Sequence, residues 1–197
     1  MNKDTQVQLY TLINEAQDNE DVKVIMLHGG RFYGSGNDLS VFVPKKGQDL
    51  GKLMEDAKEG ACVVMPKMLM SLAKSVKPII TVVRGGCLGI SFTKLVHSTF
   101  IYCSPDAYFE TPFIKSAQSP EGGSTLLFPQ IMGTRVANEI LLTDKRMTAD
   151  MAVKHGFANG VVHGFDPKSD WFNPNLIPIM EKLLSSDYRT IVNSMEQ

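Results

Sequence analysis

The stretch that organises this chain reads Lys77-Pro78-Ile79-Ile80-Thr81-Val82-Val83-Arg84-Gly85-Gly86-Cys87-Leu88-Gly89-Ile90-Ser91. Its first half is apolar and rich in β-branched residues, which predicts a buried strand. The glycines at 85, 86 and 89 predict a tight bend or a close approach of the backbone to another group. A helix over about residues 90–97 follows. A strand that turns directly into a helix indicates an α/β unit.

The same alternation extends along the chain. Further buried strands are predicted over residues 22–27, 99–103, 107–111 and 160–163. Helices are predicted over residues 6–17, 62–75, 135–142, 148–155 and 177–185. Residues 44–61 are polar and predict a mobile segment with some helix. Strands that alternate with helices across the chain predict an α/β fold.

Another glycine-rich bend, the first along the chain, follows the first predicted strand, from His28 to Leu39, with glycines at 29, 30, 34 and 36. Neither bend carries a dinucleotide-binding G-x-G-x-x-G or the Gly-Lys-Ser/Thr ending of a phosphate-binding loop. A Gly-x-Ser-x-Gly nucleophile elbow is absent too. With these motifs absent, the bends offer only their backbone N–H groups as functional groups. If the two bends meet in space, these N–H groups would form an oxyanion hole.

One carboxylate has a distinctive setting, in the stretch Gln118-Ser119-Pro120-Glu121-Gly122-Gly123-Ser124-Thr125-Leu126-Leu127-Phe128-Pro129. Ser119 is a typical helix N-cap and Pro120 a typical first helical residue, which places Glu121 in the first turn. An acid there complements the helix dipole and needs no further role. Beside an oxyanion hole, the same acid could remove the acidic α-proton of a carbonyl compound.

Composition narrows the functional classes. The chain has 197 residues, a net charge of −1 and 43% apolar residues, so it can build a core and has no basic surface for nucleic acid. Its three cysteines have no C-x-x-C spacing and are predicted to be reduced, mostly core thiols. The four histidines form no ligand pair, so no metal site is expected. No apolar run has the length of a membrane span.

Several motifs together resemble the crotonase (enoyl-CoA hydratase/isomerase) superfamily. Residues 21–29 look like its strand before the first oxyanion loop, and 32–39 are similar to its Phe-Ser-x-Gly-x-Asp-Leu signature. Residues 77–90 and 156–162 resemble its Lys-Pro-strand-Gly and Gly-Leu-Val segments. The resemblance implies a spiral of ββα units, assembled as homotrimers or hexamers. It also implies an acyl-CoA substrate, with coenzyme A as part of the substrate and no separate cofactor.

Carried over by position, the resemblance implies that the backbone N–H groups of Asn37 and Ile90 form the oxyanion hole. Asn37 could also be an ordinary turn residue that tolerates positive φ. Further substrate contacts are implied in the two bends and after the fourth strand, at Ser35, Gly36, Leu39, Gly89 and Phe113. The methionines of residues 62–75 could fill core or line an acyl pocket.

The reaction is suggested by which acids are present. The hydratases of the superfamily use two glutamates, and this chain has Thr93 and Phe113 at those positions. Glu110 is expected to point to the other face of its strand. Glu121 instead falls where the Δ3,Δ2-enoyl-CoA isomerases keep a single catalytic acid, and residues 111–113 and 118–122 look especially like the peroxisomal type. The resemblance thus favours a catalytic Glu121 and isomerisation of 3-enoyl-CoA in fatty-acid β-oxidation.

The two ends of the chain leave alternatives open. We expect a crotonase-type core over residues 1–165 and a helical extension over 166–197, without the family's usual N-terminal strand and C-terminal lid helix. A non-catalytic, truncated acyl-CoA-binding or interaction protein is one alternative, and another crotonase reaction, hydration or thioester hydrolysis, is a second. A peroxisomal location follows from the resemblance, with mitochondrial or cytosolic ones as alternatives, and the terminal Ser194-Met195-Glu196-Gln197 is no peroxisomal address.

Overall fold

A parallel four-stranded sheet forms the centre of the protein in the computed structural model, which describes residues 1–43, 46–165 and 173–195. The strand order is β1 (Ile25–His28), β2 (Ile79–Val83), β4 (Phe100–Cys103) and β7 (Gly160–Val161), every neighbouring pair being parallel. All five residues of β2 are buried, as expected for the middle of a sheet covered on both faces. The predicted strands are therefore confirmed, although β1 begins three residues later than the sequence suggested.

A second sheet, with three strands, includes residues of the glycine bend that follows β2. It contains β3 (Gly86–Leu88), β5 (Tyr108–Glu110) and β6 (Met147–Thr148), with β3 and β5 parallel and β5 and β6 antiparallel. From the sequence, residues 86–88 were expected to be part of a bend, because three residues with a glycine carry no strand signal of their own. Their strand forms through pairing with β5, about 22 residues away along the chain.

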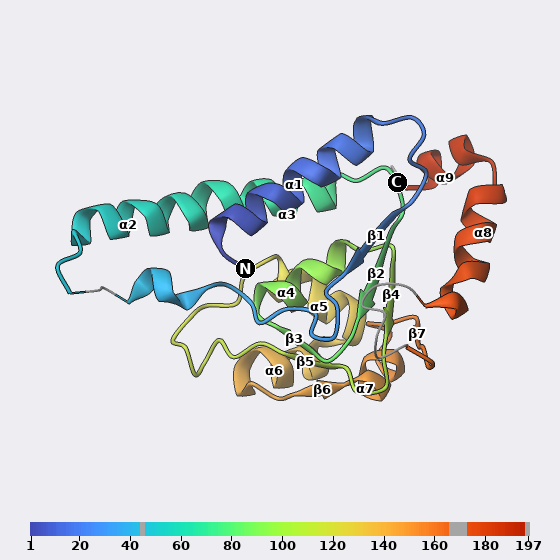
Figure 1. Cartoon of the computed structure of the whole chain (residues 1–197). Helices are drawn as coiled ribbons and strands as arrows, with labels where there is room; N and C mark the ends of the chain where they lie inside the picture. Colours follow the sequence, from blue (N-terminus) through green and yellow to red (C-terminus); the bar gives the residue numbers. More distant parts are fainter. Residues whose placement is uncertain (44–45, 166–172, 196–197) are drawn as a thin grey trace.

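Two helices, α1 (Lys3–Asp18) and α3 (Met65–Ala73), lie above the main sheet in Figure 1. A π-helical turn (Gly60–Val64) joins α3 to α2 (Leu50–Glu59), which extends beyond the sheet. Ile13 of α1 and Leu72 of α3 pack with Ile25 and Ile79 of the sheet in one buried cluster. The predicted helix over 62–75 is thus the end of a longer helical segment, and Pro44 and Lys45 of the polar segment lie outside the described residues.

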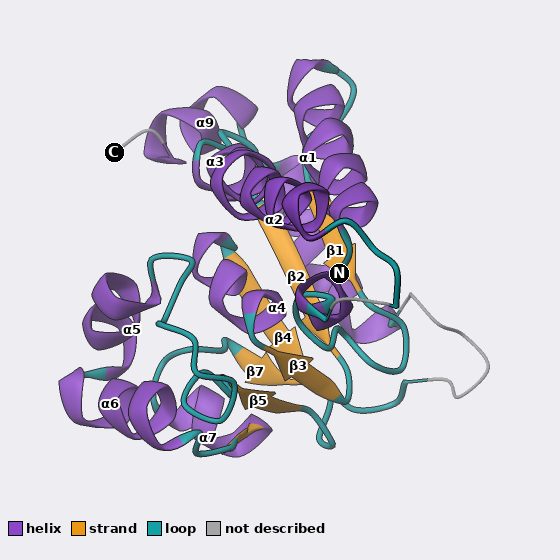
Figure 2. Cartoon of the chain, turned by 90° about the vertical axis from the view of Figure 1, so that its left-hand side faces the viewer, coloured by secondary structure: helices purple, strands orange, loops and turns teal. Residues whose placement is uncertain are grey.

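The main hydrophobic core lies on the same face of the four-stranded sheet, because it contains Val83, which points to the same side of β2 as Ile79. A further group of helices packs around this core. The group comprises α4 (Ile90–Thr93), the 3-10 helix Lys94–His97, α5 (Ser124–Met132), α6 (Thr134–Thr143) and α7 (Ala149–Lys154). Figure 2 shows α5, α6 and α7 at its lower left. Four phenylalanine rings meet here at centroid distances of 4.8–5.8 Å, from Phe92, Phe109, Phe128 and Phe157. This aromatic cluster anchors α4 and α5, which carry the site described below.

The end of the described chain packs on the outer face of the four-stranded sheet. A 3-10 turn (Pro174–Leu176) leads into α8 (Ile177–Ser185) and α9 (Tyr188–Met195). Leu176 is 1% exposed and shares a buried cluster with Ile80 and Val82 of β2. The helix predicted over 177–185 is confirmed. The expected domain boundary at 165/166 stays a prediction, and residues 166–172 and 196–197 of the extension lie outside the described residues.

One local prediction is wrong. The helix expected to start at Ser119 and Pro120 begins at Ser124 instead, with Gly123 as its N-cap. Gly122 and Gly123 have φ angles of +67° and +77°, so the chain makes a left-handed turn where helix was expected. The Ser124 hydroxyl donates to the Glu121 carbonyl at 2.7 Å and closes this turn. Glu121 therefore lies on the turn before α5 and not in its first helical turn.

None of the helices in the described part of the chain is long and apolar enough to cross a membrane. The cysteine prediction is largely confirmed, since Cys87 and Cys103 are buried free thiols, whereas the free thiol of Cys62 is exposed.

Candidate active site

A cavity of about 190 Å³ lies between the two glycine bends, the π-helical turn and the segment before α5. Every residue that the sequence analysis placed in the site lines it: Ser35, Gly36, Asn37, Leu39, Gly89, Ile90, Phe113 and Glu121. Met65, one of the methionines that could fill core or line an acyl pocket, lines the cavity too. The remaining lining residues were not foreseen as site residues: Ala61, Pro112, Ser116, Gln118 and Ser119. The structure brings the predicted residues together, and their individual roles stay predictions.

The two bends are held side by side by backbone hydrogen bonds. Gly34 N–H donates to the Gly86 carbonyl at 3.1 Å, and Leu88 N–H donates to the Gly34 carbonyl at 2.9 Å. A Cβ atom on Gly36 would lie 3.1 Å from the Leu88 carbonyl oxygen, and the φ of Gly36 is +86°. Only glycine fits this close approach without strain. The two bends therefore meet in space, which is the condition for an oxyanion hole built from both of them.

Two residues that line this cavity have backbone N–H groups without a partner in the described structure. Ile90 is the first residue of α4 and follows Gly89, whose φ is +54°. Its N–H and that of Asn37 donate to no group within residues 1–43, 46–165 and 173–195. The side chain of Asn37 is occupied, because its Oδ1 accepts from Gln6 Nε2 at 2.9 Å. Unpaired N–H groups beside a cavity are what an oxyanion hole requires.

Glu121 supplies the carboxylate. Its Oε1 accepts a hydrogen bond from the Thr93 hydroxyl at 3.0 Å, while its Oε2 is buried and has no partner among the described groups. Burial raises the pKa of Glu121 to about 7, and the hydrogen bond from Thr93 opposes the rise only in part. The sequence left open whether the helix dipole or apolar neighbours would dominate. Apolar burial dominates, because Glu121 is outside the helix.

Thr93 is a site residue that sequence reasoning missed. It was noted only as a position without a glutamate, yet it is fully buried and orients the Glu121 carboxylate. Gly122 packs directly on it, since a Cβ there would lie 2.6 Å from the Thr93 hydroxyl oxygen. The nearest signal in the sequence was the glycine pair after Glu121, which leaves room for such a contact.

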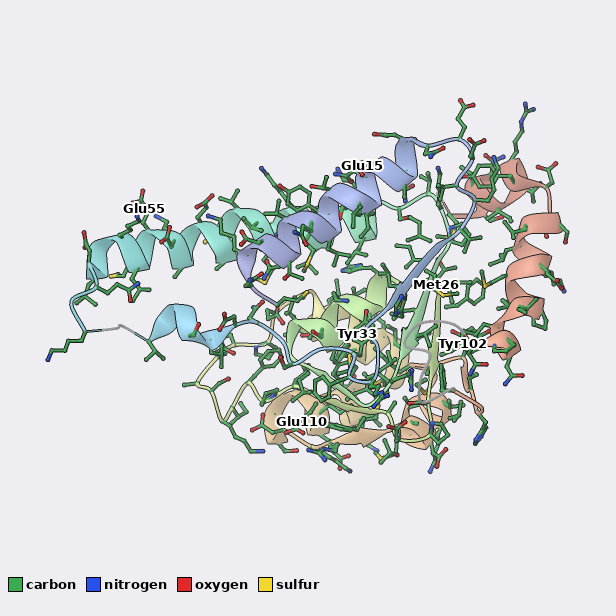
Figure 3. All side chains as sticks on the ribbon, viewed as in Figure 1. Glu15, Met26, Tyr33, Glu55, Tyr102 and Glu110 are labelled. Carbon is green, nitrogen blue, oxygen red and sulfur yellow. The ribbon has the colours of Figure 1, made fainter. Side chains whose placement is uncertain are left out.

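The other nearby acid is turned away. Glu110 accepts from Arg146 at 3.0 and 3.1 Å and lies 3.8 Å from Lys115 Nζ. Figure 3 shows Glu110 on the lower side of the molecule, apart from the central Tyr33. This agrees with the expectation that Glu110 faces away from the site. Glu121 is consequently the one acidic side chain among the described residues that line the cavity.

The methionine-rich segment divides between core and cavity. Met68 and Leu72 are buried in the core, whereas Met65 lines the cavity, one helical turn after Ala61. An unbranched, polarisable thioether can adapt to acyl chains of different shape. The described residues contain no group of three or more histidine, cysteine or acidic side chains that could hold a metal ion. The site thus combines two free N–H donors, one partly protonated acid and an adaptable apolar wall.

Comparisons with known proteins relate the chain to one family. The family model described as enoyl-CoA hydratase/isomerase matches residues 1–197. Enoyl-CoA delta isomerase 2 of Rattus norvegicus is 34% identical over 157 residues, which are 80% of this chain and 38% of that protein. Enoyl-CoA delta isomerase 3, peroxisomal, of Mus musculus is 29% identical over 189 residues, which are 89% of this chain and 56% of that protein.

The chain is also similar to proteins that are not named as isomerases and to solved structures. Chromodomain Y-like protein of Homo sapiens is 30% identical over 143 residues, 72% of this chain and 23% of that protein. The structure of a protein described as an enoyl-CoA hydratase/isomerase from Acinetobacter baumannii superposes with a TM-score of 0.82 at 25% identity, over 98% of this chain and 76% of that one. The chain spans between about a quarter and just over half of the length of these curated relatives.

Proposed function

This chain belongs to the enoyl-CoA hydratase/isomerase family, and from that premise we propose that it moves the double bond of a 3-enoyl-CoA into conjugation, giving the trans-2-enoyl-CoA. The observation that carries the proposal is the setting of Glu121. It is the single acid among the described residues that line a cavity with two free backbone N–H groups, and its pKa is raised to about 7. A base with such a pKa can both take and return a proton near neutral pH.

In the proposed reaction the thioester oxygen lies between the N–H groups of Asn37 and Ile90. The Glu121 carboxylate removes a proton from C2, and the electron pair of that C–H bond moves into a dienolate whose negative charge is concentrated on the thioester oxygen. The two N–H donors stabilise this charge. The dienolate then takes the same proton at C4, which leaves the double bond between C2 and C3 and restores the carboxylate.

One base suffices for this cycle because C2 and C4 can face it from the same side of the substrate. Hydration would need a second group to activate water, and neither Thr93 nor Phe113 can titrate near neutral pH. The proton transfers use groups of this chain alone, so the proposal involves no cofactor besides the coenzyme A of the substrate.

The cellular setting is proposed from the relatives. The mouse relative carries a peroxisomal designation, and by analogy we place this activity in peroxisomal fatty-acid β-oxidation. A homotrimer or hexamer is proposed on the same family grounds. Organelle fractionation and sedimentation of the purified chain would test these two points separately.

The deciding experiment mixes purified protein with a 3-enoyl-CoA and follows the ultraviolet absorbance of the conjugated thioester. Glu121→Gln keeps the shape of the side chain and removes the base, so its rate should fall by a factor on the order of 10²–10⁴. Glu139→Gln is the matched control, because Glu139 is an exposed acid on α6 that pairs with Lys145. An absorbance rise that persists in Glu121→Gln would refute the assigned role.

A second candidate is a non-catalytic acyl-CoA-binding protein. One observation favours it: the matched region is shared with a relative whose name denotes no enzyme, a chromodomain Y-like protein. Titration calorimetry with a saturated acyl-CoA separates the candidates. Binding without any turnover of 3-enoyl-CoA supports the binding protein, and release of free CoA thiol would indicate thioester hydrolysis instead.

A further inference from the structure

Lys94 is a lysine in the interior of the protein. It follows α4 as the first residue of the 3-10 helix and is only 6% exposed. Its Nζ donates to Tyr33 Oη at 2.6 Å and lies 4.5 Å from the centroid of the Tyr33 ring. No carboxylate in the described part of the chain forms an ion pair with it. Buried lysines without an anionic partner are rare and call for an explanation.

The groups that face Lys94 do not supply a negative charge. Burial raises the pKa of the Tyr33 phenol and of the Cys87 thiol on β3, so both are neutral. The amino group of Met1 adds positive charge nearby. Neither β2 nor α5 carries a titratable side chain, and the single one of α3, Lys67, is exposed. Lys94 is therefore a buried cation without a direct ion-pair partner in the described structure, and the Asp38 carboxylate acts on the neighbouring amino group of Met1.

Lys94 is connected to both donors of the proposed oxyanion hole, to Ile90 along the helix and to the bend of Asn37 through Tyr33. It follows Ile90 by one helical turn, and side chains of helices tilt toward the N-terminal turn. Tyr33, its partner, belongs to the bend that ends at Asn37, and Tyr33 N–H donates to the Arg84 carbonyl at 2.9 Å. In Figure 3, Tyr33 lies at the centre of the molecule below α4.

Ser91, three residues before Lys94, contacts the same bend. Its hydroxyl oxygen accepts from Gly36 N–H at 3.4 Å, and a Cβ on Gly34 would lie only 2.4 Å from it. Residues three apart share one face of a helix, so this face contacts the first bend at two points. The helix that presents one N–H donor thereby fixes the loop that presents the other.

We propose that Lys94 is a positioning residue of the oxyanion hole, which holds the first bend through Tyr33 and places a buried positive charge behind the developing enolate. The inference rests on the proposed function and names a further residue that serves the same site. The reaction places a negative charge on the thioester oxygen that the neutral substrate lacks, so a buried cation on the helix of Ile90 favours the transition state over the substrate.

Lys94 carries its positive charge only below the pH at which its amino group loses a proton. Burial lowers the pKa of Lys94 to about 8, and the nearby Cys87 counteracts this only in part. The cation is present at neutral pH and is lost above about pH 8, whereas Glu121 ionises above about pH 7. The rate should therefore rise with pH through about 7 and fall again through about 8.

The first test does not require turnover. Butyryl-CoA labelled with ¹³C at the thioester carbonyl is bound to the protein, and infrared difference spectroscopy measures its C=O stretch. A positive field behind the oxygen lowers the frequency, so the parent chain and the exposed-lysine control Lys154→Met should show a larger downshift than Lys94→Met. Equal downshifts in all three proteins would overturn the inference, even where isomerisation is observed. Failure of the parent chain to bind butyryl-CoA would overturn both proposals.

The second test uses the pH profile of kcat for 3-enoyl-CoA. In Lys94→Met we expect kcat to fall about tenfold or more, KM to change less than about threefold, and the fall above about pH 8 to disappear. Tyr33→Phe covers the case in which Lys94→Met does not fold. It removes the hydrogen-bond acceptor of the ammonium, which lowers the pKa of Lys94 and moves the alkaline limb to lower pH. An alkaline limb that is unchanged in both variants would show that Lys94 has only a packing role.

Discussion

Replacing Glu121 by glutamine should make the folded protein more stable at alkaline pH, independently of any activity. Glu121 is partly buried, its Oε2 has no hydrogen-bond partner in the described structure, and burial raises its pKa to about 7 from the ordinary 4.5. The folded state thus holds a proton more tightly than the unfolded chain does. Between pH 4.5 and 7 the folded state binds more protons, so its stability falls as the pH rises.

The size of this loss follows from the pKa displacement. Each pH unit corresponds to about 1.4 kcal/mol, so the ionised Glu121 costs the fold about 3 kcal/mol above pH 7, of which about 2–3 kcal/mol develops between pH 5 and pH 8. Glutamine is neutral throughout and carries no such cost. Glu121→Gln should therefore resemble the parent chain near pH 5 and exceed its stability by about 2–3 kcal/mol at pH 8.

Urea unfolding of both proteins at several pH values between 5 and 8 measures the difference in their unfolding free energies. The other titratable groups contribute equally to both proteins, so their contributions cancel in this difference. Glu139→Gln is the control. Because Glu139 is exposed, the stability difference between this variant and the parent should not increase from pH 5 to pH 8 in this way. A stability difference between Glu121→Gln and the parent that stays constant across this range would refute the buried, partly protonated carboxyl. It would then also remove the physical basis for a base with a pKa near 7.

Further predictions concern the groups around Glu121. Thr93→Val removes the hydroxyl that lowers the pKa of Glu121, so the acid limb of the pH–rate profile should move to higher pH, as steady-state kinetics would show. Gly122→Ala adds a Cβ at a φ of +67° and 2.6 Å from the Thr93 hydroxyl, and should cost about 1–3 kcal/mol in thermal unfolding. Phe92→Ala removes the ring that contacts three others in the aromatic cluster, and should cost about 3–5 kcal/mol in urea unfolding. Lys94→Met should leave stability at pH 7 unchanged or raise it by about 1–3 kcal/mol while kcat falls, because a buried, unpaired cation is replaced by an apolar chain.

Local pattern was a reliable guide wherever an element is long and buried. The strand over residues 79–83 and the helix over 177–185 were predicted from apolar runs that suit only one kind of element. It failed at residues 119–124, where a favourable N-cap and proline suggested a helix. Two consecutive glycines with positive φ instead turn the chain, and the Ser124 hydroxyl closes that turn.

The candidate site shows the same division. The glycine bends were recognisable because clustered glycines indicate tight turns or close backbone approach. Glu121 was selected through the family resemblance, because an acid at a helix start needs no further role by itself. Thr93 and Lys94 were not, because a threonine and a lysine near a helix are ordinary in sequence. Their interest comes from partners far along the chain, Glu121 for Thr93 and Tyr33 for Lys94, and from burial that only packing creates.

The amino-acid sequence by itself determined the α/β alternation and the places where the backbone must turn. These follow from local preferences, namely the period of apolar residues and the freedom of glycine. The tertiary structure alone decided that the two bends pair between Gly34 and β3, that Glu121 precedes its helix, and that its pKa lies near 7. Solvent exclusion and long-range hydrogen bonds set these properties, and both depend on neighbours that are distant in the sequence.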